Sequence, residues 1–347
     1  MIRVLIVEDS PVAREFLTYI LTSDPAIQVV GTANNGVEAL KSLEKNRPDV
    51  ITMDIHMPLM DGFEATRRIM ETIPTPIVIV SGSTGANEVS GTFRAIEAGA
   101  LAVVRRPPGI NHEEFEKDSR ELIQTVKLMS EIKVVKRISR VYKALEAIRP
   151  AQPLQRTTRI QAIAIGASTG GPLVLKDILS GLPRDFPVPV LIVQHIAKGF
   201  VEGFTEWLSG ASQFPLSVAS HGERLAPGHV YIAPDDVHMG LDYGLKIVLS
   251  GFAPKNSIRP SVSFLFRSMA QVLGPAAVGV LLTGMGRDGA EELKTMKDNG
   301  AITIAQNEES SVVYGMPGEA IKLGAAIYVL PPKSIAATLT DLVKQVK

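Results

Sequence analysis

The sequence of 347 residues contains no cysteine. This absence excludes a thiol nucleophile, a disulfide framework and any zinc site built on cysteine, and it agrees with a reducing compartment. An excess of one charge is also missing, because 36 lysines and arginines balance 36 aspartates and glutamates. The balanced charge gives no indication of a partner such as nucleic acid or a membrane surface.

Long hydrophobic runs are absent as well. No apolar stretch approaches the roughly 20 residues that span a bilayer. The N-terminal segment meets the acidic pair Glu8 and Asp9 instead of a small-residue cleavage site. We therefore expect a cytoplasmic protein without direct membrane insertion. With 45% hydrophobic residues, the chain is long enough for about two domains, each with its own core.

Apolar runs alternate with helix-like segments through residue 104, which predicts a parallel sheet with helices on both faces. The predicted strands are 3–7, 27–32, 49–53, 77–80 and 102–104. A charged and apolar stretch, 113–148, is predicted as a helix, and the proline-containing segment 149–158 as a linker. We expect domains at 1–120 and 159–347, joined by a helix and linker at 121–158.

A second α/β pattern begins at residue 159. Its apolar runs, taken as strands, are 160–165, 188–193, 230–233, 245–249, 276–282, 302–304 and 325–329. Its helical segments lie near 173–180, 200–208, 262–272, 290–299 and 333–346. The middle, 214–249, is rich in strands without helices, so we expect an antiparallel hairpin at one edge of a mostly parallel sheet. The predicted fold class is therefore α/β, with two doubly wound domains.

Acidic residues follow the first and third predicted strands. Glu8 and Asp9 come after the first strand, and Asp54 comes after the third. The carboxyl ends of such strands converge on one crevice, where an oxygen-only ligand set suits Mg²⁺. Ser81 ends the fourth strand and Arg106 follows the fifth, so a hydroxyl and a cation would face the same crevice. Helix capping and turn formation explain single acids, but hardly the whole set.

The first domain closely resembles the receiver domain of two-component response regulators, with VEDS, MDIHMPLMDG, VSG and RRP as its landmarks in order. The resemblance implies a flavodoxin-like fold in which Asp54 accepts a phosphoryl group from a histidine kinase. It also implies that Glu8, Asp9 and Asp54 hold Mg²⁺ and that Ser81 hydrogen-bonds the phosphoryl oxygen. Arg106 departs from the lysine of receivers, and its planar fork predicts slower or less strongly coupled phosphorylation.

The stretch GASTGG, residues 166–171, separates an apolar run from a helix-like segment. Such a turn can cradle a phosphate, present a reactive serine or serve only as a turn. A phosphate loop is the least favoured of these interpretations, because no Lys-Ser/Thr follows the glycines. Ser168 would need a base and an orienting carboxylate to act as a nucleophile. His195 and Asp288 each follow a predicted strand of the same sheet. Singly, such residues are more often structural, but three at one edge favour a serine nucleophile.

In this order and behind a receiver, GASTGG, VQHI, YIAPDDVHM, RPSVSFLF, LLTGMGRDG and VVYGMPGEA strongly resemble the chemotaxis protein-glutamate methylesterases. The resemblance covers nearly the whole chain. It implies hydrolysis of γ-glutamyl methyl esters on the cytoplasmic helices of chemoreceptors, with methanol released and no cofactor needed, often with deamidation of receptor glutamines. It implies that Ser168 is the nucleophile, His195 the base and then acid, and Asp288 the orienting carboxylate. Backbone amides near Thr169 and Met285 would form the oxyanion hole.

Two alternative functions stay open. The chain could be a phosphorylation-controlled module that binds receptors with little turnover, or a methylesterase that acts on a protein outside chemotaxis. Two departures from the family, residues 197–199 and Ser263, bear on the choice of receptor more than on the chemistry. In each case the receiver is expected to control the second domain, because a short linker joins the two.

Overall fold

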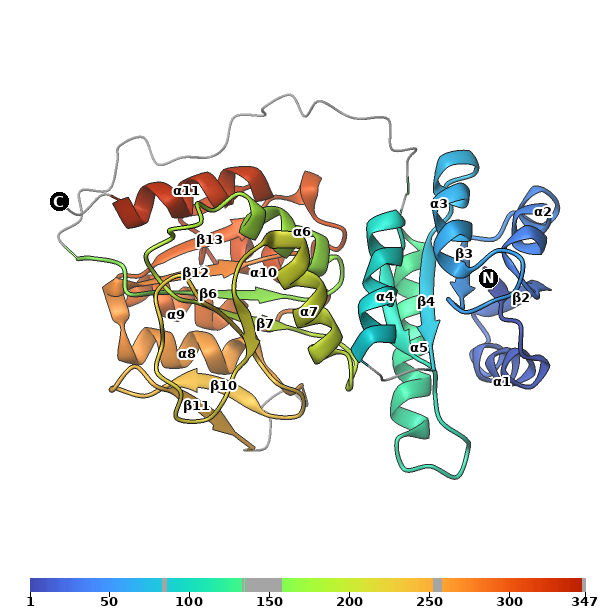
Figure 1. Ribbon diagram of the computed structural model, residues 1–347, viewed down its shortest axis with the longest axis horizontal. Helices are drawn as coiled ribbons and strands as arrows, with labels where there is room; N and C mark the ends of the chain where they lie inside the picture. The colour runs from blue at the N-terminus through green and yellow to red at the C-terminus, as the bar shows by residue number, and fades with distance from the viewer. Residues whose placement is uncertain (83–85, 133, 135–157, 252–257, 345–347) are drawn as a thin grey trace. The chain divides into compact units, whose positions relative to one another are not determined.

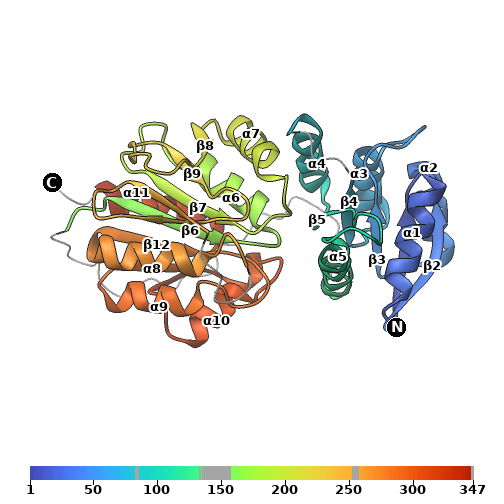
Figure 2. The same cartoon turned by 90° about the horizontal axis from the view of Figure 1, so that it is seen from below.

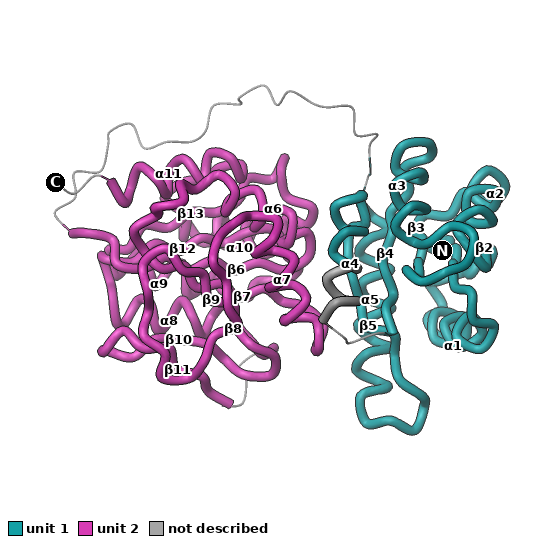
Figure 3. The backbone as a smooth tube through the Cα atoms, in the orientation of Figure 1, with its two compact units in different colours: residues 1–141 teal, residues 142–347 magenta. Residues whose placement is uncertain are grey.

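The computed structural model describes the chain except for residues 83–85, 133, 135–157, 252–257 and 345–347 (Figure 1). Contacts divide the chain into two compact units, residues 1–141 and 142–347 (Figure 3). The predicted linker, apart from residue 158, lies outside the described residues. In the described part of the chain, no helix is long and apolar enough to cross a bilayer.

The first unit is built on a parallel sheet of five strands in the order β2-β1-β3-β4-β5. These strands are β1 (Ile2–Val7), β2 (Ile27–Ala33), β3 (Val50–Met53), β4 (Ile77–Ser81) and β5 (Ala102–Arg105). The helices are α1 (Pro11–Thr22), α2 (Gly36–Asn46), α3 (Gly62–Thr72), α4 (Ala86–Ala98) and α5 (Phe115–Ser130). Helix α1 packs beside α5, whereas α3 packs between α2 and α4 (Figure 2). The predicted doubly wound sheet is confirmed.

Side-chain caps start three helices of this unit directly after strand-end loops. Ser10 accepts a hydrogen bond from the third N–H that follows it, at the start of α1. Asn35 and Asp61 do the same at the starts of α2 and α3. Each cap satisfies a backbone donor that the helix itself leaves without a partner. The caps thereby hold the loops at the carboxyl edge of the sheet in place.

The second unit is built on a seven-stranded sheet in the order β14-β13-β12-β6-β7-β9-β8, and every neighbouring pair is parallel. Its strands are β6 (Ala162–Ala167), β7 (Val190–Gln194), β8 (Leu216–Val218), β9 (Val230–Ile232), β12 (Ala277–Leu281), β13 (Ile302–Gln306) and β14 (Tyr328–Leu330). Its α-helices are α6 (Gly171–Ser180), α7 (Val201–Ser212), α8 (Val262–Val272), α9 (Ala290–Asp298), α10 (Met316–Lys322) and α11 (Pro332–Lys344). The described part of this unit also contains two 3₁₀ turns, η1 (Gly274–Ala276) and η2 (Glu308–Ser310).

The predicted antiparallel hairpin is present as β10 (His238–Leu241) and β11 (Ile247–Ser250). It forms a two-stranded sheet of its own that packs on α8, instead of extending an edge of the large sheet. The reason lies in β10, whose residues are all buried. The ring of His238 stacks on Phe264 of α8 at 4.9 Å. These contacts bury the hairpin against a helix.

Several predicted boundaries differ from the observed ones. Helix α5 ends at Ser130, whereas the sequence predicted a helix that continues to residue 148. Helix α8, by contrast, has the predicted bounds. At the end of α5 the N–H groups of Glu131 and Ile132 turn back to carbonyls three residues earlier, a tight closure that ends an α-helix. The predicted helix beyond residue 134 lies outside the described residues. Helix α10 was not predicted, because seven residues that include a proline and a glycine give little helical signal.

Candidate active site and acidic crevice

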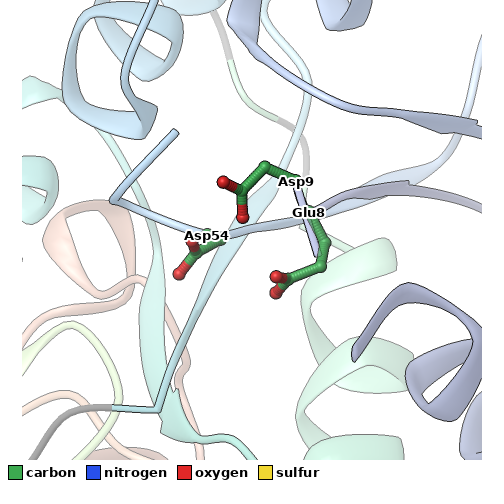
Figure 4. A group of neighbouring side chains, drawn as sticks. All are labelled: Glu8, Asp9 and Asp54. Carbon is green, nitrogen blue, oxygen red and sulfur yellow. The ribbon is translucent and has the colours of Figure 1, made fainter. Parts of the chain in front are cut away.

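Figure 4 shows Glu8, Asp9 and Asp54 together at the carboxyl ends of β1 and β3. One carboxylate oxygen from each residue lies within 4.8 Å of the others. The strand order explains the meeting, because β1 and β3 are neighbours at the point where the winding of the sheet reverses. A Cβ on Gly62 would lie 2.0 Å from the Asp54 carbonyl oxygen, so the close approach of that loop requires glycine.

The electrostatics of this crevice favour a bound cation. Burial, and next the charge of Asp54, raise the pKa of the Glu8 carboxyl. Burial also raises the pKa of Asp54, against an opposing hydrogen bond from the backbone of Ile55 and the charge of Arg106. The three carboxylates offer oxygen alone, and their oxygens are close enough to share one ion. This oxygen-only donor set fits Mg²⁺, a hard cation that prefers oxygen ligands and usually keeps several waters.

Arg106 reaches the crevice from the end of β5. Its Nη1 donates to Oε2 of Glu8 at 3.2 Å, and its backbone N–H donates to the Ser81 carbonyl at 2.8 Å. Ser81 is the last residue of β4 and is buried. A Cβ on Gly82 would lie 2.1 Å from Nη2 of Arg106, so glycine leaves the space that the guanidinium occupies. All five residues predicted for this crevice therefore lie at the carboxyl edge of the sheet.

Ser168 and His195 follow the adjacent strands β6 and β7, and Asp288 lies in the loop after β12, on the other side of β6. These loops meet where the winding of the sheet reverses, which is where such sheets bind ligands. His195 Nε2 lies 2.9 Å from Oδ2 of Asp288. In the described structure no hydrogen bond joins Ser168 Oγ to His195, and catalytic hydrogen bonds are often long before substrate binds.

Asp288 is surrounded by donors from the start of helix α8. Its Oδ1 accepts from Ser261 Oγ at 2.9 Å and from the N–H of Ser263 at 3.0 Å. Its Oδ2 accepts from the N–H of Val262 at 2.7 Å, besides the contact with His195. Burial alone would raise the pKa of Asp288, but hydrogen bonds from His195 and Ser263 hold it well below its usual range. Asp288 thus caps α8, and not the helix that follows it in sequence.

The turn that carries Ser168 is held from both sides. The N–H of Ser168 donates to the Thr283 carbonyl at 3.0 Å, and Thr283 Oγ1 donates to the Thr169 carbonyl at 2.9 Å. From the other side, Gln194 Nε2 donates to the Ser168 carbonyl at 2.9 Å. A Cβ on Gly284 would lie 2.6 Å from the Cβ of Ser168, so glycine is needed there. The sequence interpretation missed Thr283 and Gln194, although both lie within the motifs LLTGMGRDG and VQHI.

Two backbone amides lie at or beside this turn. Within the described residues, the N–H groups of Thr169 and Met285 donate to no backbone or side-chain acceptor. Thr169 directly follows Ser168, and Met285 follows Gly284, which is in contact with Ser168. Donors of this kind can receive a developing oxyanion.

The fold and the site together define a two-part α/β protein. A flavodoxin-like unit with a carboxylate crevice comes first, and a parallel-sheet unit with serine, histidine and aspartate at its switch point follows. The response regulator receiver domain model matches residues 4–113, and the CheB methylesterase model matches residues 163–339. The chain belongs to the CheB methylesterase family.

Full-length relatives share both parts. The Syntrophus aciditrophicus protein named protein-glutamate methylesterase/protein-glutamine glutaminase 1 is 57% identical over 345 residues, covering 99% of this chain and 98% of that protein. A Nitrosospira multiformis protein of the same name, without the final numeral, is 57% identical over 347 residues and is covered to 98%. The Thermotoga maritima CheB methylesterase catalytic domain is 38% identical with a TM-score of 0.52, covering 54% of this chain and 100% of that one.

Proposed function

We propose that this chain is a phosphorylation-activated serine esterase that hydrolyses glutamate methyl esters on chemoreceptors and releases methanol. The family and the names of the relatives support this carboxylic ester hydrolase activity. The observation that carries the proposal is the His195–Asp288 pair beside the turn of Ser168. The relatives are also named glutaminases, so we include deamidation of receptor glutamines, in which ammonia leaves in place of methanol.

The proposed reaction begins with Ser168. Its Oγ attacks the ester carbonyl while its proton passes to His195. Because Nε2 of His195 is engaged by Asp288, Nδ1 is the ring nitrogen that exchanges this proton. The methoxy group takes the proton and leaves as methanol, and an acyl-enzyme remains. Water then gives a proton to His195 and attacks the acyl carbon. As the bond between the acyl carbon and Ser168 Oγ breaks, His195 returns that proton to Oγ, which restores Ser168 and releases glutamate.

The backbone amides of Thr169 and Met285 are proposed as the oxyanion hole. Neither N–H is used by an acceptor of the described chain, and both border the Ser168 turn. One such donor is worth about 3 kcal/mol in the transition state. Asp288 would stay ionised throughout, because its hydrogen bonds lower its pKa, and so would stabilise His195 when it carries the extra proton.

In the receiver, we propose that Asp54 accepts the phosphoryl group from the histidine kinase of a chemosensory pathway. Glu8, Asp9 and Asp54 would hold Mg²⁺, which neutralises negative charge on the phosphoryl oxygens when bound. Ser81 would donate a hydrogen bond to one phosphoryl oxygen, and Arg106 would supply the cation of the same crevice. The shared carboxylate cluster supports these assignments.

We assign residues 1–120 to the receiver, 121–158 to the connecting segment and 159–347 to the esterase. The family matches at 4–113 and 163–339 fall inside the two domains. The proposed substrates are the cytoplasmic helices of methylated chemoreceptors, so the enzyme would act in the cytoplasm. The residues proposed for the chemistry, Ser168, His195 and Asp288, all lie in the second domain.

The test is methanol release from methylated receptor membranes, with and without a small phosphodonor and Mg²⁺. We expect the phosphodonor to stimulate methanol release. Ser168→Ala should abolish the release, and Asp54→Asn should abolish its stimulation by the phosphodonor. Ser180→Ala, at the exposed far end of the helix that follows the Ser168 turn, is the matched control and should keep full activity. Binding without methanol release would favour the receptor-binding module. Release only from methylated proteins other than receptors would favour an esterase outside chemotaxis.

A further inference from the structure

Gln194 lies between the two turns that carry Ser168 and His195. It is the last residue of β7 and is 4% exposed. Its Nε2 donates to the Ser168 carbonyl at 2.9 Å and to the carbonyl of His195 at 2.8 Å. One side-chain amide therefore joins the backbone of the nucleophile to the backbone of the base.

The orientation of this amide follows from its surroundings. Both contacts are carbonyl oxygens, which only accept, so a reversed amide would bring Oε1 against two oxygens. In the observed orientation Oε1 is buried and lacks a hydrogen-bond partner among the described residues. A Cβ on Gly171 would lie 2.2 Å from this oxygen, so the start of α6 leaves space for it. A buried acceptor without a partner costs free energy, which an apolar side chain of similar shape would avoid.

The two donated hydrogen bonds explain why glutamine is suited to this position. The Ser168 turn is fixed to the β12 side by Thr283, and this link does not involve His195. On the β7 side, the His195 N–H donates to the Ala167 carbonyl at 2.9 Å, just before the turn begins. Within the turn itself, the side chain of Gln194 connects the carbonyl of Ser168 to the carbonyl of His195. A misplacement of about 1 Å between reacting groups can cost on the order of 100-fold in rate.

We propose that Gln194 is a positioning residue of the esterase site. It does not touch substrate, and it sets the distance between Ser168 Oγ and the ring of His195 through their backbones. This inference rests on the proposed function.

The test replaces Gln194 with methionine in the full-length chain, which keeps a similar shape but removes both donors. We expect kcat for methanol release to fall by roughly 10- to 100-fold with KM within about twofold. The pH at half-maximal kcat/KM should not move, because His195 keeps its contact with Asp288. A fluorophosphonate that labels activated serines should react with Ser168 more slowly by a similar factor.

Thr303→Val is the matched control for loss of a buried hydrogen bond. Thr303 lies within β13 of the same sheet, and its Oγ1 donates to the Ala325 carbonyl at 2.6 Å. We expect this variant to lower the unfolding temperature while keeping kcat. Gln194→Glu is the second variant, because in either protonation state it loses at least one of the two donors, and it should lose at least tenfold in kcat.

Three outcomes would overturn the inference. The first is a kcat of Gln194→Met within twofold of the wild type, and the second is a rise in KM of Gln194→Met at constant kcat. The third is a loss of kcat in Thr303→Val equal to that in Gln194→Met. If the wild type itself neither releases methanol nor reacts with the fluorophosphonate, the proposed function fails, and that result is distinct from equal activity of wild type and variant.

Discussion

Asp288 accepts four hydrogen bonds, and three of the donors come from residues 261–263 at the start of α8. The carboxylate thus meets the positive end of the helix dipole as well as individual N–H groups. A buried charge is tolerated only when it is paired and fully hydrogen-bonded. This environment keeps Asp288 ionised beside His195.

The lowered pKa of Asp288 predicts a specific acid dependence of stability. A carboxyl whose folded pKa lies below its unfolded value stabilises the fold above the unfolded pKa, and this contribution is lost as the pH falls through the folded pKa. We expect Asp288→Asn to lower the free energy of unfolding by about 2–4 kcal/mol at pH 7. The difference from wild type should shrink as the pH is lowered below about 5. The free energy of unfolding is measured by urea titration, with the fluorescence of Trp207 as the signal. Trp207 is the single tryptophan and lies in the second unit.

Asp298→Asn supplies the control for this experiment. Asp298 lies at the exposed end of α9, and its ion pair with Lys294 is on the surface. Removing such a pair should change the free energy of unfolding by less than about 1 kcal/mol. A difference between wild type and Asp288→Asn that stays constant from pH 7 to pH 3 would contradict the assigned role of the lowered pKa.

Arg106 provides the prediction at the residue scale for the receiver. The planar guanidinium is held on Glu8, in space that Gly82 leaves open. A lysine would carry its charge on a flexible stem with rotatable donors, as in the receivers that this domain resembles. We expect Arg106→Lys to increase the stimulation of methanol release by a phosphodonor on the order of fivefold. Arg120→Lys, at an exposed position on α5, is the control, and an unchanged response in Arg106→Lys would count against this explanation.

At the scale of elements, helix α8 approaches strand β6 closely, with the side chain of Val262 against the backbone of Gly166. Gly166 lies inside β6, and a Cβ there would lie 2.3 Å from Cγ1 of Val262, the first residue of α8. Gly166→Ala should therefore push the start of α8 away from Asp288. We expect a loss of about 1–3 kcal/mol in the free energy of unfolding. Methanol release should fall more than tenfold in kcat, because the donors around Asp288 move with the helix.

Gly210→Ala is the matched glycine control. Gly210 lies in α7, and apart from its chain neighbours and the backbone of its own helix no described atom would lie within 4 Å of an added Cβ. Alanine in a helix is favoured over glycine by roughly 0.5–1 kcal/mol, so this variant should be slightly more stable and fully active. A Gly166→Ala protein as stable and active as Gly210→Ala would refute the contact argument.

The elements also show what the sequence could and could not predict. Strands of a covered parallel sheet are continuous apolar runs, so their order along the chain was predictable, although β6 begins at Ala162 and not at residue 160. The position of the hairpin could not be predicted from the sequence, because it depends on the packing of His238 on Phe264, which is a tertiary contact. Strand-end position pointed to His195 and Asp288. The roles of Gln194 and Thr283 depend on which carbonyls lie beside them, and no local pattern encodes this.

For the whole molecule, the prediction concerns control of the esterase by the receiver. If the unphosphorylated receiver restrains the second domain, removal of residues 1–150 should raise methanol release in the absence of a phosphodonor, on the order of tenfold. Asp54→Asn in the full-length chain is the control and should keep the low basal rate. A truncated enzyme that is no faster than the full-length protein would rule out restraint by the receiver.

The donors that hold Asp288 have a consequence for how this site can change over evolutionary time. Two of them are main-chain N–H groups of Val262 and Ser263, which every amino acid except proline supplies. The two backbone hydrogen bonds to Asp288 do not depend on which side chains stand at these positions, whereas the packing of Val262 on Gly166 and the hydrogen bond from the Gly289 N–H to Ser263 Oγ do. Proline, which is otherwise common in the first turn of a helix, is the substitution that selection should remove there.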